Sequence, residues 1–118
     1  MSSAITSGQE YMIYSGTNAL AYNGSSLTNE TVGANRNNVT SSSDNIKWTF
    51  ESVTGGGYRI FYKSGNTTYY LGIDYNNRLT LTTNVNDAET WYYDSTDHQL
   101  YRITYFYYYA YYYWMLTL

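Results

Sequence analysis

The hydrophobic and polar positions of the chain follow the pattern of short β-strands. Runs of β-branched and aromatic residues recur along the sequence, and Gly, Asn, Ser and Asp separate them. No long stretch keeps the apolar period of about 3.6 residues that an amphipathic helix needs. The pattern therefore predicts an all-β protein. The predicted strands are 11–14, 19–22, 26–28, 47–51, 58–62, 69–73, 78–82, 90–93, 100–104 and 114–118.

Landmarks along the chain repeat at a fixed spacing. Trp48 and Trp91 lie 43 positions apart, and so do the segments Tyr58-Arg59-Ile60 and Tyr101-Arg102-Ile103. The segment Tyr11-Met12-Ile13 is a looser first copy, 47 positions before the second. A spacing that several landmarks share indicates an internal repeat, with about four strands in about forty residues.

Three copies of a four-stranded unit are too few for a β-propeller and fit the lobes of a β-trefoil. We therefore expect one domain over residues 1–118, β-trefoil-like or a related β-barrel. Its repeats lie at approximately 8–54, 55–97 and 98–118. The third repeat is abbreviated, because the sequence ends before its last one or two strands. A missing strand leaves an open sheet edge, and such edges pair with other chains.

Composition narrows the class of protein. The 118 residues include 18 Tyr, 3 Trp and no Cys, only 13% are charged, and the net charge is −3. The six basic residues are scattered, whereas nucleic-acid binding needs a clustered basic surface, so we expect no nucleic-acid partner. The longest apolar run, 105–118, is mostly Tyr and is too short and too polar to span a bilayer. Abundant Ser, Thr, Asn, Gly and Tyr with few Lys and Glu are typical of an extracellular or cell-surface domain of a larger protein.

Patterns for catalysis and metal binding are weak. His98 is the only histidine and lies in a polar turn, and the nine acidic residues also lie in polar segments. One His and no Cys do not make an ordinary zinc site. The segments 74–77 and 84–87 offer oxygen ligands without calcium-loop spacing, and 75–77 fits a hairpin turn better. We therefore expect no enzymatic activity, no cofactor and no metal.

The strongest anomaly is the aromatic segment 104–114. Where the second repeat has the polar turn 62–68, the third repeat has almost only aromatic residues at 105–111. A strand alternates its faces, so one core holds at most alternate rings of such a run. Three functions fit the remaining rings: a platform that stacks on sugars, a protein-binding surface, and an edge for self-assembly into oligomers or filaments.

Several short motifs resemble those of a known family. They are Gly8-x-x-Tyr11-x-Ile13, Trp48-Thr49-Phe50, Tyr69-Tyr70-Leu71-Gly72 and Glu89-Thr90-Trp91. The chain is similar in these to the ricin-B-type β-trefoil lectins and to trefoil-like repeat modules in large cell-wall proteins of Gram-positive bacteria. It departs from the lectins in having Ile46-Lys47-Trp48 and Glu89-Thr90-Trp91 where they carry Gln-x-Trp. The resemblance implies a trefoil fold and carbohydrate binding.

These observations predict a non-enzymatic extracellular recognition module that binds carbohydrate and serves in adhesion. Protein binding or self-assembly through the same Tyr-rich C-terminal edge is the alternative. The expected ligand-binding residues are five aromatic residues of the C-terminal segment and two polar residues of the second repeat. They are Tyr107, Tyr109, Tyr111, Tyr113 and Trp114, with Asp74 and Asn76.

Overall fold

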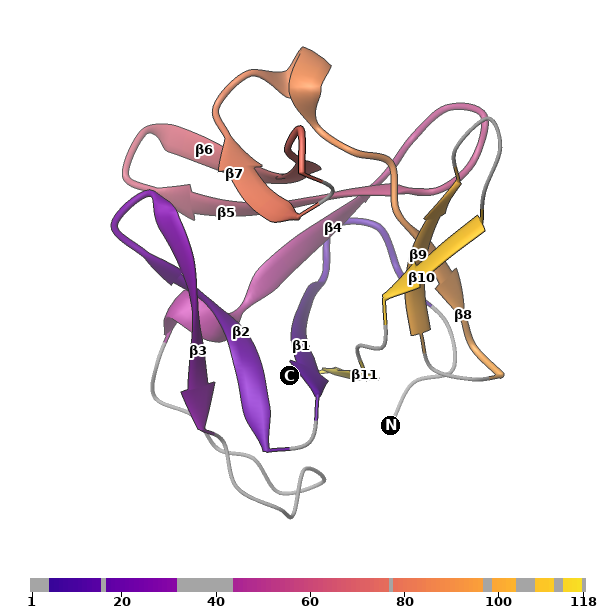
Figure 1. Ribbon diagram of the computed structural model, residues 1–118, viewed down its shortest axis with the longest axis horizontal. Coiled ribbons are helices and arrows are strands. Elements are labelled where there is room, and N and C mark those ends of the chain that lie inside the picture. The colour runs from indigo at the N-terminus through magenta and orange to yellow at the C-terminus, as the bar shows by residue number, and fades with distance from the viewer. Residues whose placement is uncertain are drawn as a thin grey trace.

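Antiparallel strands make up almost all regular structure of the protein, as the alternating pattern predicts. The computed structural model describes residues 5–15, 17–31, 44–76, 78–96, 99–103, 108–111 and 114–117 (Figure 1), and for 108–111 and 114–117 the backbone alone. No α-helix occurs among these residues. The strands are β1 (Glu10–Ser15), β2 (Asn18–Asn23), β3 (Ser26–Thr31), β4 (Trp48–Ser52), β5 (Tyr58–Ser64), β6 (Thr67–Ile73), β7 (Leu79–Thr82), β8 (Tyr92–Asp94), β9 (Gln99–Ile103), β10 (Tyr108–Tyr111) and β11 (Trp114–Thr117). Two short 3₁₀ turns, η2 (Asp44–Ile46) and η3 (Val85–Asp87), connect some of them.

Every strand that the sequence predicts is present, with ends that differ by at most three residues. The additional strand is β10, which lies inside the aromatic segment and has no polar turn before it to mark its start.

The larger sheet is barrel-like and nearly closed. Seven of its strands follow the order β3-β2-β1-β4-β5-β6-β7, and the two end strands, β3 and β7, contact each other. Strand β1 pairs with three other strands, β2, β4 and β11. Tyr14 of β1 pairs with Ala19 of β2 on one side and Trp114 of β11 on the other. Both edges of β1 are therefore occupied.

A smaller sheet of three strands, in the order β10-β9-β8, adjoins the larger one. Tyr58 at the start of β5 and Trp91 just before β8 form a bridge, in which each backbone N–H donates to the other residue's carbonyl at 2.7 Å. Strand β11 also contacts β9. The two sheets therefore contact each other through this bridge and through β11.

The C-terminal strand returns to the larger sheet. Strand β11 pairs with β1 over four residues, from Tyr11↔Thr117 to Tyr14↔Trp114. Strand β11 begins three positions after the end of β10 and belongs to the other sheet. In the smaller sheet β10 is an end strand, so the open edge expected from the abbreviated third repeat stays a prediction.

The spacing of 43 also fails at one landmark. Phe50 pairs with Ile60 between β4 and β5, whereas Tyr93 pairs with Leu100 between β8 and β9. Leu100 follows Ile60 by 40 positions, and both side chains are buried. The connection between β8 and β9 is shorter, so the pairing shifts and Leu100 takes the inward position that the sequence match assigns to Ile103.

Two tryptophans hold the core in the same way at two places. Trp48 and Trp91 are buried, and their indole N–H groups donate to the carbonyls of Leu20 at 2.9 Å and Leu71 at 3.4 Å. Trp48 also pairs with Tyr11 as Trp91 pairs with Tyr58. Each large ring therefore buries apolar area while its one polar atom keeps a partner.

Candidate functional site

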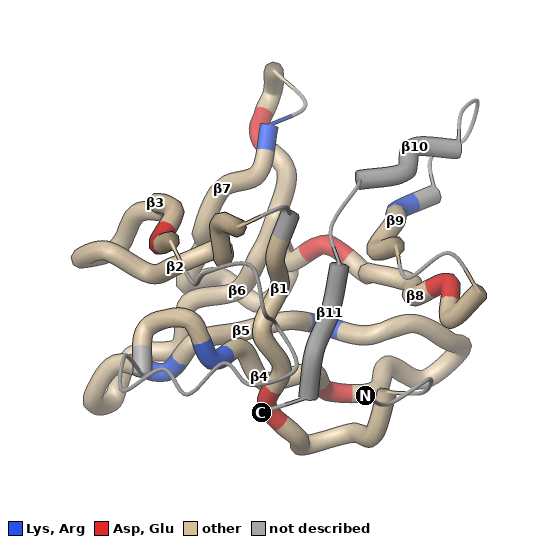
Figure 2. Tube along the Cα trace, turned by 90° about the horizontal axis from the view of Figure 1, so that it is seen from below, with Lys and Arg blue, Asp and Glu red and all other residues tan. Residues whose placement is uncertain are grey.

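The turn between β6 and β7 projects from the body of the protein. Figure 2 shows it at the top, with its acidic and basic positions side by side. Oδ1 of Asp74 accepts hydrogen bonds from the backbone N–H groups of Asn76 at 2.8 Å and Arg78 at 3.0 Å. The N–H of Asp74 in turn donates to the Arg78 carbonyl at 2.9 Å. The predicted hairpin turn is confirmed, and Asp74 is the residue that fixes its shape.

Beside this turn the surface is hollowed. The hollow has a volume of about 380 Å³ and is lined by six residues of the described part of the chain. They are Ile73, Asp74, Tyr75, Thr80, Thr82 and Asp87. The strands supply the two threonines, the turn supplies an acid and a tyrosine, and η3 supplies the second acid.

Tyr75 dominates the rim of the hollow. Its side chain is fully exposed, with a relative accessibility of 105%. Both faces of this ring are therefore open to solvent, where a ligand can stack on them. Asn76, the next residue of the turn, is also exposed.

The opposite wall is positioned by close packing of η3 against β6. A side chain at Gly72 would place its Cβ 3.0 Å from the Asp87 carbonyl oxygen, so it would push η3 away from β6. The Glu89 N–H donates to the Leu71 carbonyl at 3.1 Å. The side chain of Asn84 caps η3 by accepting from the Asn86 N–H at 3.0 Å. Hydrogen bonds to backbone groups therefore hold both walls of the hollow in place.

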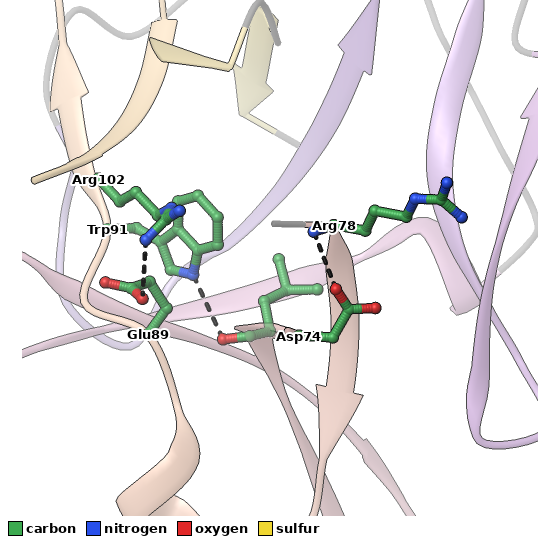
Figure 3. A network of polar contacts seen from close by, with 6 residues as sticks. Asp74, Arg78, Glu89, Trp91 and Arg102 are labelled. Carbon is green, nitrogen blue, oxygen red and sulfur yellow. Dashed lines mark hydrogen bonds and ion pairs between the residues drawn. The ribbon is translucent and has the colours of Figure 1, made fainter. Parts of the chain in front are cut away.

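A charged pair lies behind this wall. Figure 3 shows Arg102 extending beside the Trp91 indole toward Glu89, and its guanidinium lies 4.0 Å from the Glu89 carboxylate. Arg102 is 7% exposed. The pair joins β9 to the segment after η3 and so supports the packing of the wall. Neither residue lines the hollow, whose charged lining residues are Asp74 and Asp87.

The hollow brings together the chemistry that a sugar needs. An aromatic ring stacks on the apolar face of a pyranose, and carboxylate and hydroxyl oxygens bond its hydroxyl groups. Oδ1 of Asp74 serves the turn, which leaves Oδ2 for a ligand.

The structure separates the residues predicted from the sequence. Asp74 lines the hollow and Asn76 lies in the same turn. Tyr109 and Tyr111 belong to β10 and Trp114 to β11, which pair in different sheets, so the aromatic segment is not one continuous strand. Tyr107 and Tyr113 lie outside the described residues, as does His98.

Sequence reasoning missed five residues of the hollow: Ile73, Tyr75, Thr80, Thr82 and Asp87. The sequence did indicate Tyr75, because it is a bulky aromatic residue between two predicted site residues, Asp74 and Asn76, in a predicted turn. Nothing in the sequence indicated Asp87, because it reaches the site through the packing of η3 on Gly72.

Other kinds of site were also sought in the described part of the chain. No group of three His, Cys, Asp or Glu side chains there could hold a metal ion. No described helix is long and apolar enough to cross a membrane. Comparisons of the chain with protein-family models, with curated proteins and with solved structures found no match.

Proposed function

We propose that this protein is a non-enzymatic carbohydrate-binding module of an extracellular or cell-surface protein, and that the hollow beside the β6–β7 turn binds the sugar. One observation carries the proposal: the fully exposed ring of Tyr75 stands at the rim of a hollow that two carboxylates and two threonines line. This arrangement offers a stacking face and several hydrogen-bonding oxygens to one small polar ring.

The order of the strands supports a β-trefoil-like fold for the module. Consecutive contacts lead from β1 to β4, β5, β8, β9 and β11 and return to β1, which makes a ring of six strands. The hairpins β2–β3 and β6–β7 lie outside this ring. Between β9 and β11 of the proposed third repeat, β10 is the one strand among the described residues.

The aromatic segment 105–114 stays a second candidate surface for the same ligand, or for a protein partner. Self-assembly through the same Tyr-rich C-terminal edge stays the alternative, since β10 is an end strand of the smaller sheet and pairs with β9 in the described residues.

A screen of immobilised glycans against the purified domain tests the proposal. We expect binding to one class of neutral sugar, and we expect Tyr75→Ala to weaken it by at least about tenfold, or about 1.4 kcal/mol, because the stacking face is lost. Asp74→Asn should also weaken binding while the domain stays folded, since the amide oxygen still accepts the two N–H bonds of the turn.

Asn66→Ala is the matched control for this screen. Asn66 is an exposed residue of the neighbouring β5–β6 turn and lies outside the lining of the hollow. Unchanged glycan binding by Tyr75→Ala, with Asn66→Ala behaving identically, would refute the assignment of the hollow.

A further inference from the structure

Three tyrosines from two hairpins form a cluster on the side of the barrel. Tyr62 and Tyr69 are cross-strand partners in the β5–β6 hairpin. The ring of Tyr22, from β2, stacks on Tyr62 with centroids 4.4 Å apart and lies 5.0 Å from that of Tyr69, tilted by 45°. All three side chains are half-buried, so solvent reaches them.

The cluster lies where the two hairpins meet. Figure 1 shows the turn of β2–β3 beside the β5–β6 hairpin. In the sheet, β2 pairs with β1 and β3, and β5 pairs with β4 and β6. Among the described residues, therefore, no strand of one hairpin pairs with a strand of the other. Side chains therefore make the contact, and Tyr22 and Tyr69 are 47 positions apart in the chain.

The rings of Tyr22 and Tyr69 lie against each other, with centroids 5.0 Å apart. The interaction of the two phenol groups lowers the pKa of Tyr22 and raises that of Tyr69, which agrees with hydroxyl groups placed near each other. At this separation a small side-chain rotation brings the ring carbons beside the two hydroxyl groups into contact. In a biphenol made by joining those carbons, the hydroxyl groups also lie near each other.

We propose that Tyr22 and Tyr69 are a site of oxidative cross-linking, in which a carbon–carbon bond joins the two rings next to their hydroxyl groups. The co-reactant is a one-electron oxidant of the peroxidase class with hydrogen peroxide. Each phenol loses one electron and one proton, and the two phenoxyl radicals couple at the carbons ortho to oxygen. The hydrogen on each coupled carbon then moves to its oxygen and restores the ring. One peroxide accepts the two electrons and two protons and leaves as two waters.

The cross-link gives the protein a covalent tie that its sequence otherwise lacks, since it has no cysteine. It joins the β2–β3 hairpin to the β5–β6 hairpin and restricts the unfolded chain as a disulfide does. The cross-linked domain should therefore melt at a higher temperature than the untreated one.

The test treats the dilute domain with a haem peroxidase and one equivalent of hydrogen peroxide. We expect a monomer that has lost two hydrogen atoms, shows dityrosine fluorescence, and yields one linked pair of peptides containing Tyr22 and Tyr69. Tyr69→Phe keeps the ring but removes the phenol, so it should abolish this peptide pair and the rise in melting temperature.

Tyr101→Phe is the matched control. Tyr101 stacks on Tyr92 with centroids 5.5 Å apart, so this variant removes a phenol from a comparable ring pair and should leave the Tyr22–Tyr69 link intact. A link to Tyr62 in place of Tyr69, or cross-linking that occurs only between molecules, would overturn the proposal. Since glycan binding is not involved, neither result bears on the proposed function.

Discussion

Replacing Trp48 with alanine is expected to lower the free energy of unfolding by about 4 kcal/mol, the largest effect of any single substitution considered. The ring is fully buried among core residues such as Phe50 and Ile60, and it makes an edge-on contact with Tyr62 at 5.9 Å. Alanine would leave a large cavity and would also free the Leu20 carbonyl that the indole now bonds at 2.9 Å. Urea unfolding followed by near-ultraviolet circular dichroism measures the loss.

Phenylalanine at the same position separates the two contributions. Trp48→Phe keeps most of the apolar ring and removes the N–H donor, so it should cost less than alanine. It should still cost more than Trp91→Phe, because the bond from Trp91 to Leu71 is longer, at 3.4 Å. Val85→Ala, at an exposed position, should stay within about 0.5 kcal/mol of the parent. A loss below about 1 kcal/mol for Trp48→Ala would contradict the assignment of this ring to the centre of the core.

Replacing Gly57 with alanine is expected to cost about 3 kcal/mol, the second largest effect. Its φ is +82°, a conformation that side chains disfavour. An added Cβ would lie 2.5 Å from Cγ2 of Thr90 and 3.0 Å from the Trp91 carbonyl oxygen. That oxygen accepts the N–H of Tyr58 at 2.7 Å, so relief of the clash would disturb the bridge between β5 and the smaller sheet.

Gly55→Ala is the control for this prediction. Gly55 also has a positive φ, +97°, but a Cβ there would meet no atom within 4 Å. It should therefore cost only the backbone strain, about 1 kcal/mol. Equal urea midpoints for the two variants would contradict the prediction, because they would mean that the contacts with Thr90 and Trp91 add no cost to a side chain at position 57.

The strands could be predicted because their pattern is local. Alternating apolar residues and polar turns mark the β1–β2 and β5–β6 hairpins in the sequence itself. The spacing of Trp48 and Trp91 also reflected a real equivalence, since both rings make the same contacts. The match of Tyr58 to Tyr101 did not, because the shorter connection after β8 changed the register.

The site and the C-terminal pairing depend on contacts between distant segments. Strand β11 pairs with β1, about a hundred positions earlier, and no periodicity records that choice of partner. Asp87 joins Asp74 and Tyr75 because η3 packs on Gly72, which a sequence pattern does not reveal. The aromatic segment was predicted as a site from its composition. The hollow has one exposed aromatic ring, Tyr75, which composition does not reveal.

The most direct test of sugar binding at the hollow is a nuclear magnetic resonance titration of the isotope-labelled domain with the glycan that binds best in the screen. We expect the saturating shifts to centre on the backbone amides of Asp74, Tyr75 and Asn76, with Thr80, Thr82 and Asp87 also responding. Shifts confined to residues 105–114, with these amides unmoved at saturation, would contradict the account and place recognition in the aromatic segment.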